Sequence, residues 1–119
     1  MAFVEKPFKA GEIIFREGTP GDIAYLLTEG KIGIEIQCSQ GPKTIAVVNP
    51  VSIFGELALL LDDNKRTATA RALEDSRMVV IERADFEKYI KDSPPVIQSL
   101  VTVFAKRLKN MNCKLAEVI

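Results

Sequence analysis

One stretch of the chain carries residue types that suit the binding of a phosphorylated sugar. The sequence Phe54-Gly55-Glu56-Leu57-Ala58-Leu59-Leu60 follows a glycine with good helix formers, which predicts a short helix. Amides in the first turn of a helix have no intrahelical partner, and such free amides can bind an anion. Glu56, at the start of this predicted helix, could accept hydrogen bonds from sugar hydroxyls.

A guanidinium and a hydroxyl follow this predicted helix. Arg66 has the planar fork that suits phosphate, and Thr67 beside it offers a hydroxyl. Each residue also has an ordinary structural interpretation. Arg66 could pair with Asp62 or Asp63 at the surface, Thr67 could be a plain strand residue, and Glu56 could only stabilise the helix N-terminus. The spacing of Glu56 and Arg66 favours the phosphate site.

The elements that must position these residues are mainly β-strands. The segment 31–38 alternates, with Ile32, Ile34, Ile36 and Cys38 on one side, which is typical of a half-buried strand. Turn formers separate the candidate strands, most densely at 17–22, and Gly41-Pro42 and Asn49-Pro50 are expected to turn the chain. The candidate strands are 12–15, 23–28, 31–38, 44–48, 69–73 and 77–82. Many short strands at this spacing indicate a sandwich or barrel.

The last third of the chain has helical periodicity. Phe86, Tyr89 and Ile90 fit one face of a short helix, and Ser93-Pro94-Pro95 is a start signal for a longer one. Spacings of four and three residues alternate along the second helix, which is a heptad pattern. Such a face can be core or interface, and both interpretations stay open here. Its apolar positions are Ile97, Val101, Phe104, Leu108, Met111, Leu115 and Val118.

Composition excludes several classes of protein. The chain has 119 residues, no histidine, and 16 basic against 16 acidic residues. The missing histidine removes Ser-His-Asp and Cys-His sites and every histidine metal ligand, so we expect no enzyme, no metal and no cofactor. The balanced charge is unlike that of a general nucleic-acid or membrane binder. Without a signal peptide or spanning segment, a cytoplasmic protein is expected, with Cys38 and Cys113 as reduced thiols; a single disulfide stays open.

The phosphate-site stretch resembles a known family. Residues 54–60 followed by Arg66-Thr67-Ala68-Thr69 are similar to the phosphate-binding cassette of cyclic nucleotide-binding domains, as in catabolite activator proteins, cyclic-nucleotide-dependent kinases and nucleotide-gated channels. The turn at 18–22 and the strand up to Gly30 also fit. The resemblance implies a mainly β fold with C-terminal α structure: an eight-stranded β-roll, jelly-roll-like, followed by a short helix and a longer helix. One domain over 1–119 is expected, with the roll over about 8–83 and the helices over about 84–118.

The resemblance also implies roles for individual residues. Arg66 would pair with the cyclic phosphate, helped by the amides of Ala58 and Thr67, and Glu56 would accept from the ribose 2′-hydroxyl. The family usually has a glycine-rich turn before Phe54, where this chain has Asn49-Pro50-Val51-Ser52, so a differently built turn is expected. The other candidate contacts are Gly55 and Leu57 for the ribose, and Thr67, Asn110 and Asn112 for the base.

The expected function is a regulatory sensor that binds cAMP or cGMP and moves its C-terminal helix in response. Expected partners are the nucleotide, a downstream effector and a second copy of the chain, without nucleic acid or membrane. One alternative is a β-roll interaction module that has no ligand. Another is a sensor domain cut from a transcription regulator, kinase or channel. The predicted dimer contact comprises Val101, Phe104, Leu108, Met111 and Leu115.

Overall fold

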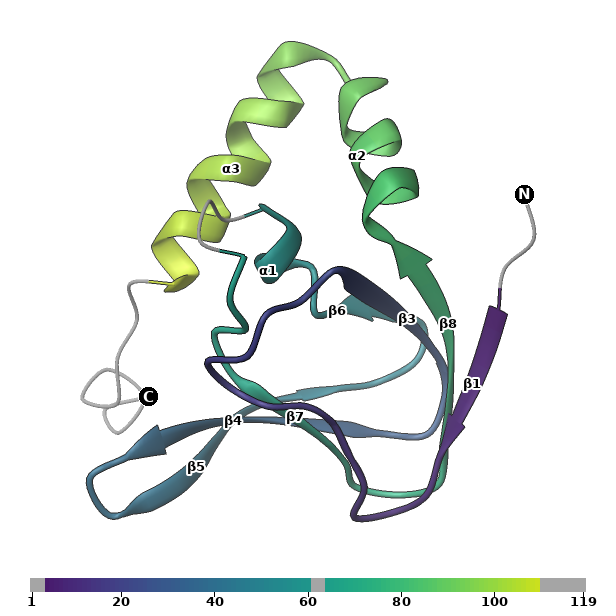
Figure 1. Ribbon diagram of the computed structural model, residues 1–119, viewed down its shortest axis with the longest axis vertical. Helices are drawn as coiled ribbons and strands as arrows, with labels where there is room; N and C mark the ends of the chain where they lie inside the picture. The colour runs from purple at the N-terminus through teal and green to yellow at the C-terminus, as the bar shows by residue number, and fades with distance from the viewer. Residues whose placement is uncertain (1–3, 61–63, 110–119) are drawn as a thin grey trace.

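Two antiparallel sheets form the body of the molecule. The computed structural model describes residues 4–60 and 64–109, with the backbone alone for residues 57, 60 and 104–109. One four-stranded sheet has the order β1 (Val4–Phe8), β8 (Ser76–Glu82), β3 (Ile23–Glu29), β6 (Ser52–Phe54). The other has the order β2 (Ile13–Phe15), β7 (Thr69–Ala72), β4 (Ile32–Cys38), β5 (Gly41–Val48). The sheets face each other (Figure 1), which confirms the predicted eight-stranded β-roll.

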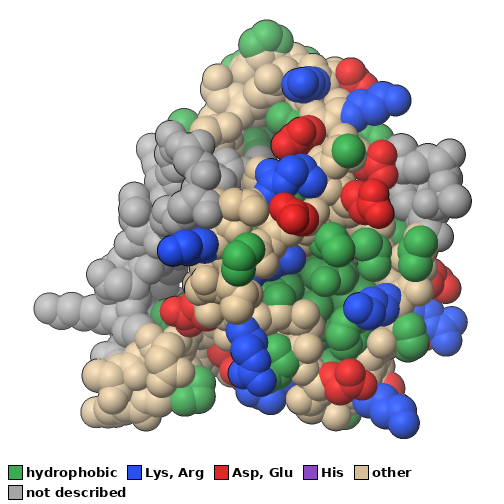
Figure 2. Space-filling model, in the orientation of Figure 1, with side chains coloured by type: hydrophobic (Ala, Val, Ile, Leu, Met, Phe, Trp, Pro, Cys, Tyr) green, Lys and Arg blue, Asp and Glu red, His purple; other side chains and the backbone are tan. Residues whose placement is uncertain are grey.

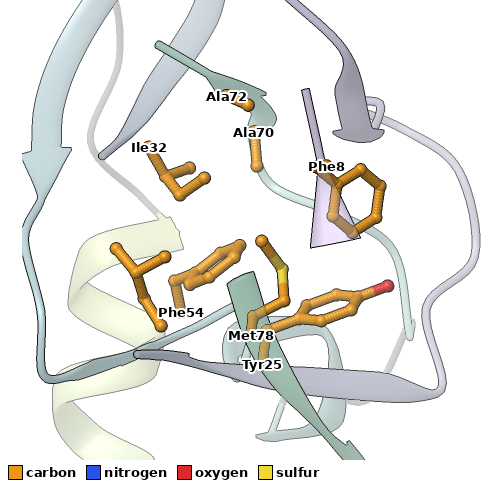
Figure 3. Close-up of a cluster of buried hydrophobic side chains, with 8 residues drawn as sticks. Phe8, Tyr25, Ile32, Phe54, Ala70, Ala72 and Met78 are labelled. Atoms are coloured by element: carbon orange, nitrogen blue, oxygen red, sulfur yellow. The ribbon is translucent and has the colours of Figure 1, made fainter. Parts of the chain in front are cut away.

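The core lies between the two sheets because alternate residues of each strand point inward. Leu27, Ile32 and Met78 are fully buried, and they come from both sheets. Figure 3 shows Ile32 and Met78 beside aromatic rings from β1, β3 and β6. The buried cluster comprises Phe8, Tyr25, Leu27, Ile32, Phe54, Ala70, Ala72 and Met78.

Three helices lie at one end of the β-roll (Figure 1). The single-turn α1 (Leu57–Leu60) follows β6, α2 (Arg83–Lys91) follows β8, and α3 (Pro95–Lys109) begins with a proline, which the first helical position tolerates. A second buried cluster attaches the helices to the outer face of β3 and β8, with Leu59 of α1 and Phe86 of α2 packing on Ala24 and Ile81. Contacts also join α1 to α3. The predicted short and longer C-terminal helices are therefore confirmed.

The structure corrects the sequence prediction in three places. Two strands, β1 and β6, were not predicted as separate elements, and β1 starts at Val4 and pairs along the whole of its length with β8. Gly41 and Pro42 belong to β5, opposite Cys38 and Gln37, so the turn precedes them. Pro42 fits because β5 is an edge strand, where a missing amide hydrogen breaks no ladder on the open side.

Several sequence predictions concern residues that the structure leaves undescribed. Asn110, Met111, Asn112, Cys113, Leu115 and Val118 lie outside the described residues, as do the side chains of Leu57, Phe104 and Leu108. Within the described part of α3, Val101 is half-buried, whereas Val96, Ile97, Leu100 and Val103 are exposed. Cys38 is disulfide-bonded, so the expectation of a reduced thiol is wrong at this position.

The surface has mixed charge and one apolar groove. Figure 2 shows acidic and basic side chains scattered over this face, with hydrophobic side chains gathered below α2 over β3 and β8. A groove of about 430 Å³ between α2 and the outer face of the sheet includes Leu26, Val79 and Phe86. Among the described helices, none is both long and apolar enough to cross a membrane.

Candidate functional site

Gly55 turns the chain from β6 into α1. Its φ is +80°, a conformation that residues with a Cβ rarely adopt. A Cβ at this position would also lie 3.0 Å from Arg66 Nη1 and 3.0 Å from Phe15 Cε2. The glycine is therefore needed for its backbone conformation and for the close approach of the arginine.

The Arg66 side chain is buried beside this turn. Only 6% of the residue is exposed. Its Nη1 donates to the Gly55 carbonyl oxygen at 2.7 Å, and its Nη2 donates to the Ile23 carbonyl oxygen at 2.7 Å. Among the residues that the structure describes, which exclude Asp62 and Asp63, the buried Nε has no hydrogen-bond partner. No ion pair joins Arg66 to an acidic side chain within the part of the chain that the structure describes.

The Arg66 guanidinium lies on the face of an aromatic ring, which itself stacks on two further rings. The Arg66 Cζ lies 4.0 Å from the centroid of the Phe15 ring, which is a cation–π arrangement. Phe15 stacks on Tyr25 and on Phe54, with centroids 6.1 Å apart in each pair. The ring under the arginine thus comes from β2, and β3 and β6 each contribute one ring that stacks on it. These rings also belong to the core or pack against it. The packing of the core therefore fixes the position of the Phe15 ring, on which the guanidinium lies.

The turn before β3 closes over Arg66 from the other side. Gly18 N–H donates to the Arg66 carbonyl oxygen at 2.8 Å, and the Arg66 N–H donates to the Thr19 carbonyl oxygen at 2.8 Å. A Cβ on Gly21 would collide with Nε and Cζ of Arg66. The turn formers recognised in the sequence therefore have two roles. Their backbone pairs with the Arg66 backbone, and Gly21 leaves room for the Arg66 side chain.

Burial shifts the pKa values of the charged groups in the site. Desolvation raises the pKa of Glu56, although its own backbone amide and the Arg66 charge act in the opposite direction. Desolvation lowers the pKa of Arg66, while Tyr25, Asp22 and Glu56 raise it. Burial also raises the pKa of the Tyr25 phenol. The carboxylate and the guanidinium therefore lie close enough to interact, in surroundings that have little water.

The structure brings most of the predicted site residues together. Gly55 contacts Arg66 directly, Glu56 interacts with its charge, and Ala58 is buried in α1, only 1% exposed. Thr67 is half-buried next to the arginine in the chain. The structure does not test which of these residues contact a ligand.

Sequence reasoning missed the residues around the arginine. Phe15 and Tyr25 read only as apolar strand residues, and Gly21 only as a turn former. Their importance depends on contacts between segments far apart in the chain, such as the bond from Arg66 to Ile23 across 43 positions. Only the density of turn residues at 17–22 could have indicated a special role for that loop.

Comparison with known proteins identifies the family. The family described as the cyclic nucleotide-binding domain matches residues 5–93. The chain belongs to this family. The predicted resemblance is thereby confirmed, and it covers the whole β-roll and α2 of this cyclic nucleotide-binding domain.

Relatives of this domain are mostly regulatory proteins. A CRP-like cAMP-activated global transcriptional regulator of Mycobacterium tuberculosis is 33% identical over 113 residues, which is 94% of this chain and 50% of the regulator. The crystal structure of the Thermus thermophilus catabolite activator protein matches with a TM-score of 0.73 and 31% identity, covering 98% of this chain and 55% of that one. The chain thus spans about half the length of these relatives.

A further solved structure belongs to an enzyme. The cAMP-bound form of the EAL enzyme Bd1971 matches with a TM-score of 0.81 and 31% identity, over 89% of this chain and 28% of the enzyme. A cGMP-bound form of the same enzyme matches equally well. The fold of this cyclic nucleotide-binding domain therefore occurs in proteins that differ in the rest of their chains.

Proposed function

We propose that this domain binds a 3′,5′-cyclic nucleotide, one per chain, and acts as a regulatory sensor. The single observation that carries the proposal is the state of Arg66. A buried cation donates to two neutral carbonyl oxygens and leaves Nε unpartnered. An unsatisfied buried donor costs about 1–3 kcal/mol, and a phosphate oxygen is a stronger, charge-assisted acceptor than a carbonyl. A cyclic phosphate would relieve this cost.

The remaining contacts follow the predicted roles. Ala58 and Thr67 supply amides to the phosphate, and Glu56 accepts from the ribose 2′-hydroxyl, with Gly55 and Leu57 beside it. The raised pKa of Glu56 reflects a carboxyl group that has lost part of its hydration. A ribose hydroxyl could supply the missing hydrogen bond. Thr67, Asn110 and Asn112 are proposed for the base. We propose cAMP as ligand, with cGMP binding comparably, which agrees with the two forms of the related enzyme.

The proposed output is movement of α3. Because α3 contacts α1, a ligand that shifts α1 changes the stability of the docked α3. The exposed apolar side chains of α3 are proposed to pair with a second copy of the chain, and a downstream effector is proposed to read the change. Catalysis is no part of the proposed role, because the chain has no histidine to act as a general base.

Calorimetric titration with cAMP and cGMP tests the proposal. The parent domain should bind both nucleotides, and 5′-AMP, which has the same base but an open phosphate, should bind far more weakly. Arg66→Ala removes one partner of a buried charge pair, which costs about 2–5 kcal/mol of binding free energy. Arg66→Lys should recover little of that loss, because a lysine cannot make the forked contacts.

Arg77→Ala is the matched control. It removes the same charge from an exposed position on β8, and it should leave both affinities unchanged. If the parent binds neither cyclic nucleotide, the proposal fails, and the ligand-free interaction module takes its place. If Arg66→Ala binds as tightly as the parent, the pocket has been assigned to the wrong residues.

A further inference from the structure

Arg83, the first residue of α2, is attached to the turn that closes over Arg66. Its backbone N–H donates to the Asp22 carbonyl oxygen at 3.0 Å. Its Nε donates to Asp22 Oδ1 at 3.2 Å, and Nη2 donates to the Gly21 carbonyl oxygen at 3.1 Å. Gly21 is the residue that packs against the Arg66 guanidinium. The start of α2 is therefore joined to one wall of the proposed phosphate site.

The same guanidinium also holds α1. Nη1 donates to the Leu59 carbonyl oxygen and Nη2 to the Ala58 carbonyl oxygen, both at 3.4 Å. Carbonyls at the end of a helix have no intrahelical donor, and a cation there is stabilising. Ala58 is also a residue whose amide is proposed to bind phosphate. Arg83 therefore contacts the carbonyl oxygen of the same residue whose amide is proposed to face the ligand.

A third segment completes the network. Nη2 of Arg83 donates to Asn64 Oδ1, and Asn64 Nδ2 approaches Asp22 Oδ1 at 3.4 Å. The Gly21 N–H donates to the Asn64 carbonyl oxygen at 3.0 Å. Asn64 has a φ of 58° and lies two positions before Arg66. One side chain thus joins α1, the turn before β3 and the residues preceding Arg66.

We propose that Arg83 is a positioning residue that makes the phosphate-binding segment and α2 move as one unit. The inference rests on the proposed function, because it assigns the contacts by which phosphate binding would change the position of α2. A lysine would keep the charge, but it cannot direct separate nitrogens at Asp22, Leu59 and Gly21. Leu59 of α1 and Phe86 of α2 pack in the same apolar cluster, whereas Arg83 joins the two helices by directional bonds.

Hydrogen exchange with and without cAMP tests the proposal on the parent, Arg83→Ala, Arg83→Lys and the control Arg77→Ala. Calorimetry first measures the affinity of each protein for cAMP. Each exchange experiment is then run at a cAMP concentration that saturates the protein. In the parent and in Arg77→Ala, cAMP should change amide exchange both at 55–60 and in α2. In Arg83→Ala and Arg83→Lys, the change at 55–60 should remain while the change in α2 is lost. Their affinity for cAMP should fall by about two- to thirtyfold, the range for coupling residues.

The outcomes separate this inference from the proposed function. A parent that binds cAMP, together with an Arg83→Ala variant whose α2 still responds at saturation, overturns the role of Arg83 and leaves the sensor intact. Full recovery of the α2 response in Arg83→Lys would show that charge alone suffices, which also overturns it. A parent that binds no cyclic nucleotide overturns both. Arg83→Lys keeps the size and charge of the side chain, so the test remains decisive if Arg83→Ala does not fold.

Discussion

At the scale of single residues, Arg66 is the side chain on which the proposed binding site depends. Its side chain is held by two carbonyl oxygens and the face of Phe15, and none of these neutralises its charge. Desolvation consequently lowers the pKa of the guanidinium. An anion that replaces a carbonyl oxygen would add the attraction between opposite charges in a place with little competing water. The arginine is thus kept in position by neutral partners, which we propose a phosphate replaces.

Glu56 makes a separate prediction about pH. Burial raises the pKa of its carboxyl above the ordinary value of 4.5. The folded chain therefore holds this proton more tightly than the unfolded chain does. Stability should fall as the pH rises from 4.5 through the raised pKa, because the unfolded chain releases the proton first. Glu56→Gln removes this contribution, so urea unfolding should show the variant gaining stability relative to the parent over that pH range.

Glu74→Gln supplies the control for this pH effect. Glu74 is exposed in the connection between β7 and β8, so its replacement by glutamine controls for the removal of one exposed carboxylate. A difference between the parent and Glu56→Gln that stays constant across the range would show that Glu56 is not the group whose burial matters. If the parent instead gains stability relative to Glu56→Gln as the pH rises, Arg66 stabilises the carboxylate more than burial destabilises it.

The sequence predicted the residues of the site better than their surroundings. The spacing of Gly55, Glu56 and Arg66 was recognisable because all three lie within one short segment. Phe15 and Gly21 were not recognisable as site residues, because an aromatic ring in a strand and a glycine in a turn have ordinary structural explanations. Only the fold places the ring beneath the guanidinium and the glycine against its side.

At the scale of elements, the strands that show an apolar alternation or an apolar run between turn formers were predicted, and β1 and β6 were not. β4 alternates over its length, and its predicted extent differs from the observed one at a single residue. β1 has four exposed residues out of five and contains Pro7, so no apolar pattern marks it as a strand. β6 has three residues, which is too short to show a period. Their pairing with β8 and β3 supplies what their sequences lack.

Phe86 provides a prediction for the attachment of α2. Its ring packs on Ala24, Leu59 and Ile81, so it joins α2 both to the sheet and to α1. Phe86→Ala should lower the free energy of unfolding by about 1–3 kcal/mol, less than the cost at a fully buried site, because the ring is only partly buried. Urea unfolding measures this loss, and faster amide exchange in α2 should accompany it.

Lys88→Ala is the control on the same helix. Lys88 is exposed, and surface substitutions usually change stability by less than about 0.5 kcal/mol. If Phe86→Ala is no more destabilising than Lys88→Ala, then α2 is not held by the apolar cluster. In that case the hydrogen bonds of Arg83 would be its main attachment, and the proposed coupling would depend on them alone.

At the scale of the whole molecule, the helices and the site share one end of the β-roll (Figure 1). α1 contacts α3 and packs with α2 through Leu59, so the proposed phosphate segment touches both C-terminal helices. The β4–β5 hairpin is also joined to the turn that pairs with Arg66, because the Gln37 N–H donates to Glu17 Oε1 at 2.9 Å. The helices, however, pack directly on α1, so we expect a binding event to be transmitted mainly toward α2 and α3.

The exposed face of α3 carries the last prediction, which concerns self-association. Val96, Ile97, Leu100 and Val103 are between 43% and 64% exposed. A soluble protein normally covers a contiguous apolar strip. Of these four residues only Ile97 belongs to the heptad pattern of the sequence, so the exposed strip lies beside the predicted dimer contact and shares one position with it. Two α3 helices packed side by side would cover it. The parent should therefore sediment as a dimer at high micromolar concentration, and Leu100→Lys should sediment as a folded monomer, because a charge cannot enter this contact without a partner.

Ile45→Lys is the matched control, since it makes the same change at an exposed apolar position on β5, far from α3 in the fold. It should sediment like the parent, and circular dichroism should show that both variants keep the β-roll. If Ile45→Lys dissociates the dimer while Leu100→Lys does not, the contact lies on the β4–β5 hairpin. If the parent is monomeric both with and without cAMP, two chains do not pair through α3, and the apolar strip can act only within one chain, against the site.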